Sequence, residues 1–353
     1  MLSLISLAWT NSVNLVNQMA LATSYNVSGD REDLTNFLTI LEPEDCPKTS
    51  TFAKNSKVSN SYQTWQADTL AAVDFSGVKE GADVSAFNNE AANRARFGGY
   101  IQKLWRPWMV SDIQEASDPA GVSSEVSNSK VKAMRELKRS IEAMVGSDQD
   151  TQADTGTVPY LCRGLGKWVQ ATAQTTLPVP TRFLTPTGNI NTTATASLTE
   201  ALFNAVFQSI FTQNGGRRAY TLFAGPNLIT AVNTFQRAEG ASGTTKTYQV
   251  VQDADAREIT LDVTIYKGSF HTVTVVPDLF NGLVTGADVT TTTNQQLARG
   301  YVIDPTLVGI GTMLGVESIE LENQGGGRRG LVQTAVLLMV KNPKGLGKFA
   351  ATS

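Results

Sequence analysis

The chain has 353 residues, of which 41% are hydrophobic and 17% charged, a balance typical of a folded protein. Its length exceeds what one hydrophobic core usually serves, so we expect two or more subdomains. The formal net charge of -3 excludes a strongly basic nucleic-acid binder, because neutralising many phosphates needs an excess of Lys and Arg. Two cysteines, Cys46 and Cys162, are too few for a disulfide framework and lack zinc-ligand spacing.

The N-terminus predicts an arm followed by a short helix. The start, MLSLISLAW, lacks the basic residues of a secretory signal and is too short to span a bilayer, so we expect an intracellular protein. After the arm, four apolar residues recur at the spacing of one helix face. They are Leu34, Phe37, Leu38 and Leu41. A helix of about three turns is marginal alone in water, so this face needs a partner surface.

Residues 51–108 predict a long two-stranded excursion. Two extended stretches that carry aromatic residues flank a polar middle, FSGVKEGADVSAFNNE. Trp65, Trp105 and Trp108 lie in the extended stretches and Phe87 in the middle. A hairpin with little chain nearby to bury these rings needs a neighbouring molecule, so we take all four as candidates for contact with one.

The strongest helical pattern runs from Ser123 to Val145 and ends at Gly146. Its apolar stripe consists of Met134, Leu137, Ile141, Met144 and Val145. We expect one long helix laid across a sheet. Its opposite face carries Glu136 and Glu142 among lysines and arginines, which favours a solvated or subunit-facing surface over a DNA-binding one.

The middle of the chain alternates helices and strands. Ser197 and Glu200 have the spacing of a capping box ahead of an apolar helix. Residues 219–224 predict a strand, and Pro226 is expected to open another helix.

The remaining strand patterns complete a mixed α+β fold. Apolar residues alternate over 259–265, a two-residue turn is expected at Gly268–Ser269, and the alternation resumes at Val273, which together predict a hairpin. The last strand, 335–340, is apolar on both faces and should be buried on both sides.

No catalytic, cofactor-binding or metal-binding residues emerge. GIGTMLG lacks the spacing of a dinucleotide-binding loop. Glu317, Glu320 and Glu322 could serve carboxylate chemistry, but a solvated strand face is favoured because no His or Asp lies near them. The sole histidine, His271, lies in an alternating strand, which favours a structural or surface role over catalysis.

The run GGGRRG carries Arg328 and Arg329, which could grip a phosphate. A glycine hairpin turn is favoured, with the two arginines solvated or paired with acids of a neighbouring subunit. We therefore add them to the contact candidates.

Several stretches, taken in order, resemble tailed-bacteriophage major capsid proteins of the Hong Kong phage fold. These stretches are REDL (31–34), the prolines at 43 and 47, WQADTL (65–70), QEA (114–116), SE (124–125) and ELKRSIE (136–142). The close match covers about residues 24–150, and beyond it the agreement rests on the order of elements.

The resemblance implies an α+β fold of five parts. These are an N-terminal arm with a short helix (1–50), an extended loop or E-loop (51–110), a P-domain spine helix (111–160), an A-domain (161–300) and P-domain return strands (301–353). In such a fold the arm and the E-loop reach over neighbouring subunits.

The resemblance also implies a structural protein and no enzyme. Copies of the chain would self-assemble into hexamers and pentamers that form an icosahedral head around double-stranded DNA, with weak non-specific DNA contact and no membrane. A separate scaffolding protein, a portal and, in some members, a decoration protein would be partners. The chain would reside in the virion after assembly in the host cytoplasm. Two alternatives stay open, an encapsulin-like shell protein and a carboxylate-dependent hydrolase.

Overall fold

The computed structural model describes residues 45–84, 87, 89–117, 121–213, 216, 219–235, 264–283 and 294–350. The predicted arm and the helix with Leu34, Phe37, Leu38 and Leu41 lie outside these residues. The statements below concern one compact unit, formed by Ile40–Ser117 and Ser124–Ser353.

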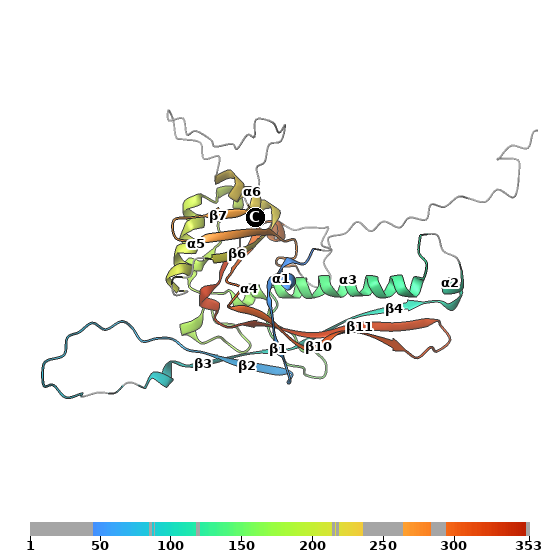
Figure 1. Cartoon of the computed structure of the whole chain (residues 1–353), viewed down its shortest axis with the longest axis horizontal. Helices are drawn as coiled ribbons and strands as arrows, with labels where there is room; N and C mark the ends of the chain where they lie inside the picture. The colour runs from blue at the N-terminus through green and yellow to red at the C-terminus, as the bar shows by residue number, and fades with distance from the viewer. Residues whose placement is uncertain are drawn as a thin grey trace, which may run out of the picture. The chain divides into compact units, whose positions relative to one another are not determined.

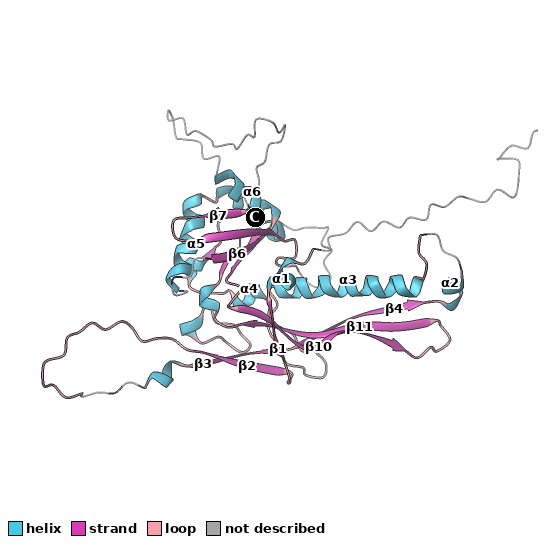
Figure 2. Cartoon of the chain, in the orientation of Figure 1, coloured by secondary structure: helices cyan, strands magenta, loops and turns pink. Residues whose placement is uncertain are grey.

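A four-stranded sheet has the strand order β1-β10-β11-β4 (Figures 1 and 2). Its strands are β1 (Ala53–Lys57), β10 (Val308–Leu321), β11 (Arg328–Val340) and β4 (Gln102–Val110). β10 and β11 form a long antiparallel hairpin whose turn contains Gly325 and Gly327, at φ 87° and 109°. Glycine suits these positions because it has no Cβ to clash. β11 is buried over most of its length, which confirms the expectation from its apolar run.

The long helix α3 (Glu125–Gly146) packs across β4 and β11 (Figure 1). Its first turn is capped by Ser124, whose hydroxyl accepts the N–H of Ser127 at 3.3 Å. The predicted helix is thus confirmed, with Gly146 as its last residue.

The buried side of α3 differs in part from the predicted stripe. Leu137, Met144 and Val145 are buried as expected, but Met134 is 42% exposed and Ala133 is buried in its place. Ala133 shares a core cluster with Trp108 of β4, so the bulky indole fills the space that a larger helix residue would need.

A six-stranded sheet has the order β5-β12-β9-β6-β8-β7. Its strands are β5 (Ile190–Asn191), β12 (Gly347–Ala350), β9 (Arg299–Ile303), β6 (Ala219–Ala224), β8 (Thr272–Pro277) and β7 (Ile265–Lys267). Helices α5 (Glu200–Gln213) and α6 (Pro226–Phe235) share a core cluster with it, and α7 (Asn294–Ala298) leads into β9. The strand at 219–224 and the helix opened by Pro226 are confirmed.

Two local predictions in this region were wrong. The hydroxyl of Thr199, not Ser197, accepts the N–H of Leu202 at the start of α5, because Ser197 ends a separate 3-10 turn. The β7–β8 hairpin exists, but four residues connect its strands, since Lys267 pairs with Thr272. The predicted alternation at 259–263 lies outside the described residues.

Strands β2 (Tyr62–Ala67) and β3 (Ala95–Tyr100) pair antiparallel as the stem of the excursion. The shorter elements are α1 (Pro47–Thr51), α2 (Asp112–Ala116), α4 (Leu165–Trp168) and the 3-10 turns Glu90–Asn93, Thr181–Phe183, Thr187–Asn189, Thr195–Ser197 and Pro343–Gly345.

The predicted segment boundaries do not coincide with the division of the strands between the sheets. β1 and β4 fall within the range predicted for the extended loop, yet both pair in the four-stranded sheet, so the two-stranded stem is limited to 62–100. β12 falls within the range predicted for return strands but pairs with β9 in the six-stranded sheet.

Candidate functional site

The excursion loop, Asp68–Arg94, carries large apolar side chains with little of the chain around them (Figure 1). Their exposed fractions range from 70% to 96%, at Leu70, Val73, Phe75, Val78, Val84 and Phe87. Apolar side chains gathered in this way mark an interaction surface more often than an ordinary monomer surface.

The stem of the excursion is anchored by aromatic contacts within the chain. The Trp65 ring lies 5.8 Å from that of Trp168, and its indole N–H donates to the carbonyl of Val340 at 2.9 Å. The Phe97 ring meets Phe183 edge-on at 5.2 Å. Trp65 therefore positions the stem within its own chain, and the exposed loop begins beyond it.

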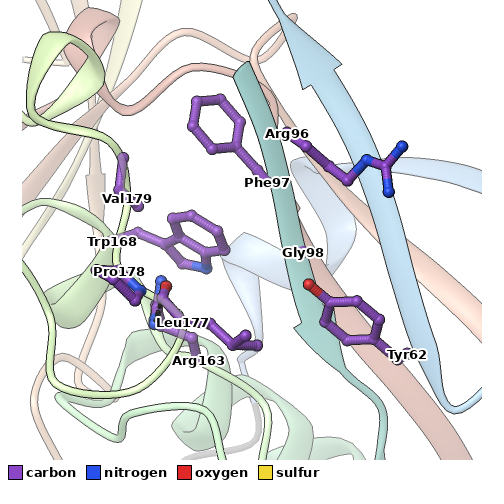
Figure 3. A pocket seen from close by; sticks show the side chains of 9 residues that line it. All are labelled: Tyr62, Arg96, Phe97, Gly98, Arg163, Trp168, Leu177, Pro178 and Val179. Carbon is purple, nitrogen blue, oxygen red and sulfur yellow. Dashed lines mark hydrogen bonds between the residues drawn. The ribbon is translucent and has the colours of Figure 1, made fainter.

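A cavity of about 150 Å³ lies beside this stem (Figure 3). The Arg163 guanidinium lies over the Trp168 ring and forms an ion pair with Asp150 at 2.8 Å, while Tyr62 lines the opposite side. The other lining residues are Arg96, Phe97, Gly98, Leu177, Pro178 and Val179. The titratable side chains of this lining are the phenol of Tyr62 and the guanidinium groups of Arg96 and Arg163.

The four-stranded sheet presents a second exposed apolar surface, which we call the outer sheet face. Its four large side chains are Trp105 and Met109 of β4, each 62% exposed, and Ile319 (37%) and Leu321 (47%) of β10. All four share one face, because Met109 pairs with Arg329 and Arg329 with Leu321, while alternate β4 residues such as Trp108 face α3.

The other predicted contact residues separate into different environments. Trp108 is 7% exposed and packs under α3, where the Lys130 ammonium lies 5.1 Å from its ring, so it offers little surface to a neighbour. Arg328 lies on the α3 side, 3.7 Å from Glu320, whereas the guanidinium of Arg329 donates to the carbonyl of Glu322. Phe87 and Trp105 are exposed.

The three glutamates of β10 do not converge. Glu317 accepts a hydrogen bond from Gln333, and Glu320 pairs with Lys130. The Lys130 ammonium, as hydrogen-bond donor and as charge, lowers the pKa of the Glu320 carboxyl below its usual range.

His271 has a structural environment, which is one of the two roles, structural or surface, that its sequence context favoured. Its ring is 2% exposed and stacks on Phe207 with centroids 4.5 Å apart. Neither ring nitrogen has a hydrogen-bond partner among the described residues. Burial lowers the pKa of the imidazole.

The described part of the chain offers neither a membrane-spanning helix nor a metal-binding cluster. No helix there is long and apolar enough to cross a bilayer. No group of three or more His, Cys, Asp or Glu side chains is placed there to hold a metal ion.

Sequence reasoning missed a buried polar cluster, formed by Lys48, Glu142, Asp278 and Asn281, which we call the Lys48 cluster. Each member is at most 3% exposed. Glu142 accepts the backbone N–H groups of Lys48 and Thr49, at 2.8 and 2.9 Å, and so satisfies the free amides at the start of α1. The expectation that Glu142 lies on the solvated or subunit-facing side of α3 was wrong, because its carboxylate is 0% exposed and accepts the amides at the start of α1.

Comparisons with known proteins agree with the fold. The family model of the SU10 major capsid protein matches residues 16–353. A capsid chain of cyanophage A-1(L) aligns with a TM-score of 0.64 at 11% identity, over 94% of this chain and 99% of that one. Mycobacterium phage Bobi gives 0.59 at 10% identity over 94% and 99%, and the capsid of cyanophage P-SCSP1u gives 0.53 at 13% identity over 95% and 94%.

A search of curated protein sequences found no match. The solved structures show that the chain has the α+β phage-capsid fold expected from its sequence. The match over nearly the whole length shows that the chain belongs to the SU10 major capsid protein family and is a structural protein of a tailed-phage virion.

Proposed function

We propose that copies of this chain close into hexamers and pentamers by seating the excursion loop of one copy on the outer sheet face of the next. The observation that carries the proposal is the presence of two exposed apolar surfaces in one folded chain, on the excursion loop and on the outer sheet face. Such a contact is heterologous, and a heterologous contact closes into a ring when its rotation allows.

Charge supports the same pairing. Residues 68–84 of the loop contain four acids, Asp68, Asp74, Glu80 and Asp83, against one lysine. The outer sheet face carries Lys103 and Arg329 beside its apolar residues, with Glu317 as the acid. Complementary charge of this kind guides encounter and fixes register more than it adds affinity.

Ring-to-ring contacts would then close the icosahedral head around double-stranded DNA. Many weak contacts make a strong shell, because each contact after the first is effectively intramolecular. The modest net charge suits weak, non-specific contact with the packaged DNA. A separate scaffolding protein, a portal and a decoration protein belong to this proposal, as do assembly in the host cytoplasm and the absence of enzymatic activity.

The pairing is tested with two single-surface variants. We expect Phe75→Ser with Val78→Ser on the loop, and Trp105→Ser with Met109→Ser on the face, each to fold and to remain unassembled in size-exclusion chromatography and electron microscopy. Ile113→Ser, which replaces another exposed apolar side chain at 82% exposure, should still assemble. Mixing the two defective variants should give a one-to-one complex, since each retains one intact surface; absence of that complex would contradict the pairing.

A further inference from the structure

Lys48 is a nucleophilic side chain that the assembly surfaces do not use. It is 0% exposed, and its ammonium donates to the Asp278 carboxylate and, at 3.1 Å, to Oδ1 of Asn281. Glu142 Oε1 lies 3.5 Å from the same nitrogen. Lys48 and Asn281 are 233 positions apart in sequence, so the fold brings an amine and a carboxamide together in a site without water access.

Hydrogen bonds orient each partner toward this nitrogen. The Asn281 amide nitrogen donates to the carbonyl of Phe223 at 3.2 Å, which turns Oδ1 toward Lys48. Asp278 Oδ1 accepts the N–H of Phe280 at 2.8 Å, which leaves Oδ2 for Lys48. The Asn281 Cγ, one bond beyond Oδ1, is therefore held next to the amine, and such proximity is worth a large effective concentration.

Gly146, at the end of α3, provides the space for this arrangement. A Cβ at this position would lie 2.3 Å from the Phe280 carbonyl oxygen and 3.0 Å from the Lys48 nitrogen. The Gly146 carbonyl also accepts the N–H of Gly282 at 2.8 Å and the Tyr301 hydroxyl at 3.1 Å. Gly146 thus leaves room for the Lys48 amine and ties the end of α3 to the residue that follows Asn281.

We propose that Lys48 and Asn281 condense into an intrachain amide bond, with Asp278 as the proton acceptor. Asp278 takes a proton from the ammonium, and the free amine attacks Cγ of Asn281. The new C–N bond forms as the bond from Cγ to Nδ2 breaks. The leaving nitrogen departs as ammonium with the two protons that Lys48 gives up, so nothing is oxidised or reduced and no cofactor is needed.

The bond would attach the segment that follows the arm to the loop after β8, across the end of α3. Because Asn281 lies between β8 and the described start of α7, the linkage would join the two sheet-bearing parts of the fold covalently. A cross-link between distant positions stabilises mainly by restricting the unfolded chain. This role does not depend on how the copies assemble.

The mass of the full-length chain, measured after purification from folded protein and denaturation, tests the proposal directly. We expect a mass lower than the sequence mass by one ammonia, and a protease digest should yield a branched peptide joining Lys48 to Asn281. Lys48→Gln and Asn281→Leu should each restore the sequence mass, and Asp278→Asn should slow the loss.

Lys130→Gln, which removes an ion-paired lysine of α3, is the matched control and should leave the mass loss unchanged. The mass of the wild-type chain tests the proposal even if a variant fails to fold. A wild-type chain at its full sequence mass after prolonged folding would overturn the proposal. Loss of one water instead would show that Asp278 is the acyl partner and would overturn the assignment to Asn281.

Discussion

The Glu142 carboxylate accepts the backbone N–H of Lys48 at 2.8 Å, across 94 positions of sequence, with both side chains fully buried. A carboxylate of α3 thus takes the place of water as the hydrogen-bond acceptor for the first free backbone N–H groups of α1. Because a buried charge that loses its partner is costly, this contact fixes where the chain enters the fold after the arm.

Glu142→Gln should therefore destabilise the subunit. The two N–H groups bond to different oxygens of Glu142, and the amide replaces one of these oxygens with an NH2 group that cannot accept; it also removes a charge beside Lys48. We expect the free energy of unfolding to fall by about 3 kcal/mol, as for a broken buried ion pair. Denaturant unfolding of the free subunit measures it, with Glu136→Gln on the same helix as the control; equal effects of the two substitutions would refute the explanation.

Gly146→Ala separates two opposing effects. Helix propensity alone predicts a gain of about 1 kcal/mol in a helix interior. The Cβ would instead lie 2.3 Å from the Phe280 carbonyl oxygen, so we expect a net loss of about 1–3 kcal/mol in thermal or denaturant unfolding. Gly77→Ala, where nothing lies within 4 Å, should be close to neutral. A Gly146→Ala variant more stable than the wild-type chain would show that the loop at Phe280 moves to make room for the added Cβ.

His271 should make the subunit sensitive to mild acid. Burial lowers its pKa in the folded chain below the ordinary 6.5, so the unfolded chain binds the proton more readily. Its contribution to stability is complete above about pH 6.5 and falls as the pH drops toward the folded-state pKa. We expect His271→Phe to flatten the dependence of the unfolding free energy on pH below about pH 6.5; an unchanged slope would argue against this role.

Both cysteines should resist thiol reagents in the folded subunit. Burial is the main cause that raises the pKa of Cys46 to about 11 and that of Cys162 to about 12. The reactive thiolate is therefore scarce at pH 8, and the side chains are also enclosed. Titration with a chromogenic disulfide should show slow reaction in buffer and rapid reaction of both in denaturant. Fast labelling of folded protein would contradict this placement.

Sequence patterns predicted the elements whose stability is local. The 3.6-residue period located α3, and the strand at 219–224 followed from its apolar run. The same period failed at Met134, because the packing of Trp108 against α3 lets the small Ala133 face the sheet instead. When the partner surface is unknown, the helical period places the buried stripe of a helix only to within about one residue.

The exposed apolar surfaces were predictable only in part. Exposed Phe87 and Trp105 were identified from their aromatic context, but Trp108 from the same stretch is buried, and Trp65 is half-buried and hydrogen-bonded to the Val340 carbonyl. Which face of β4 a residue occupies depends on pairing with β11, more than two hundred positions away. The Lys48 cluster was missed for the same reason, since three separate segments meet there.

Cryo-electron microscopy of assembled shells tests the central claim most directly. We predict that the loop residues Phe75 and Val78 of one copy will lie against Trp105 and Met109 of its neighbour around each hexamer and pentamer. Shells in which the outer sheet face carries no neighbouring loop, or chains that stay monomeric with and without a scaffolding protein, would contradict it.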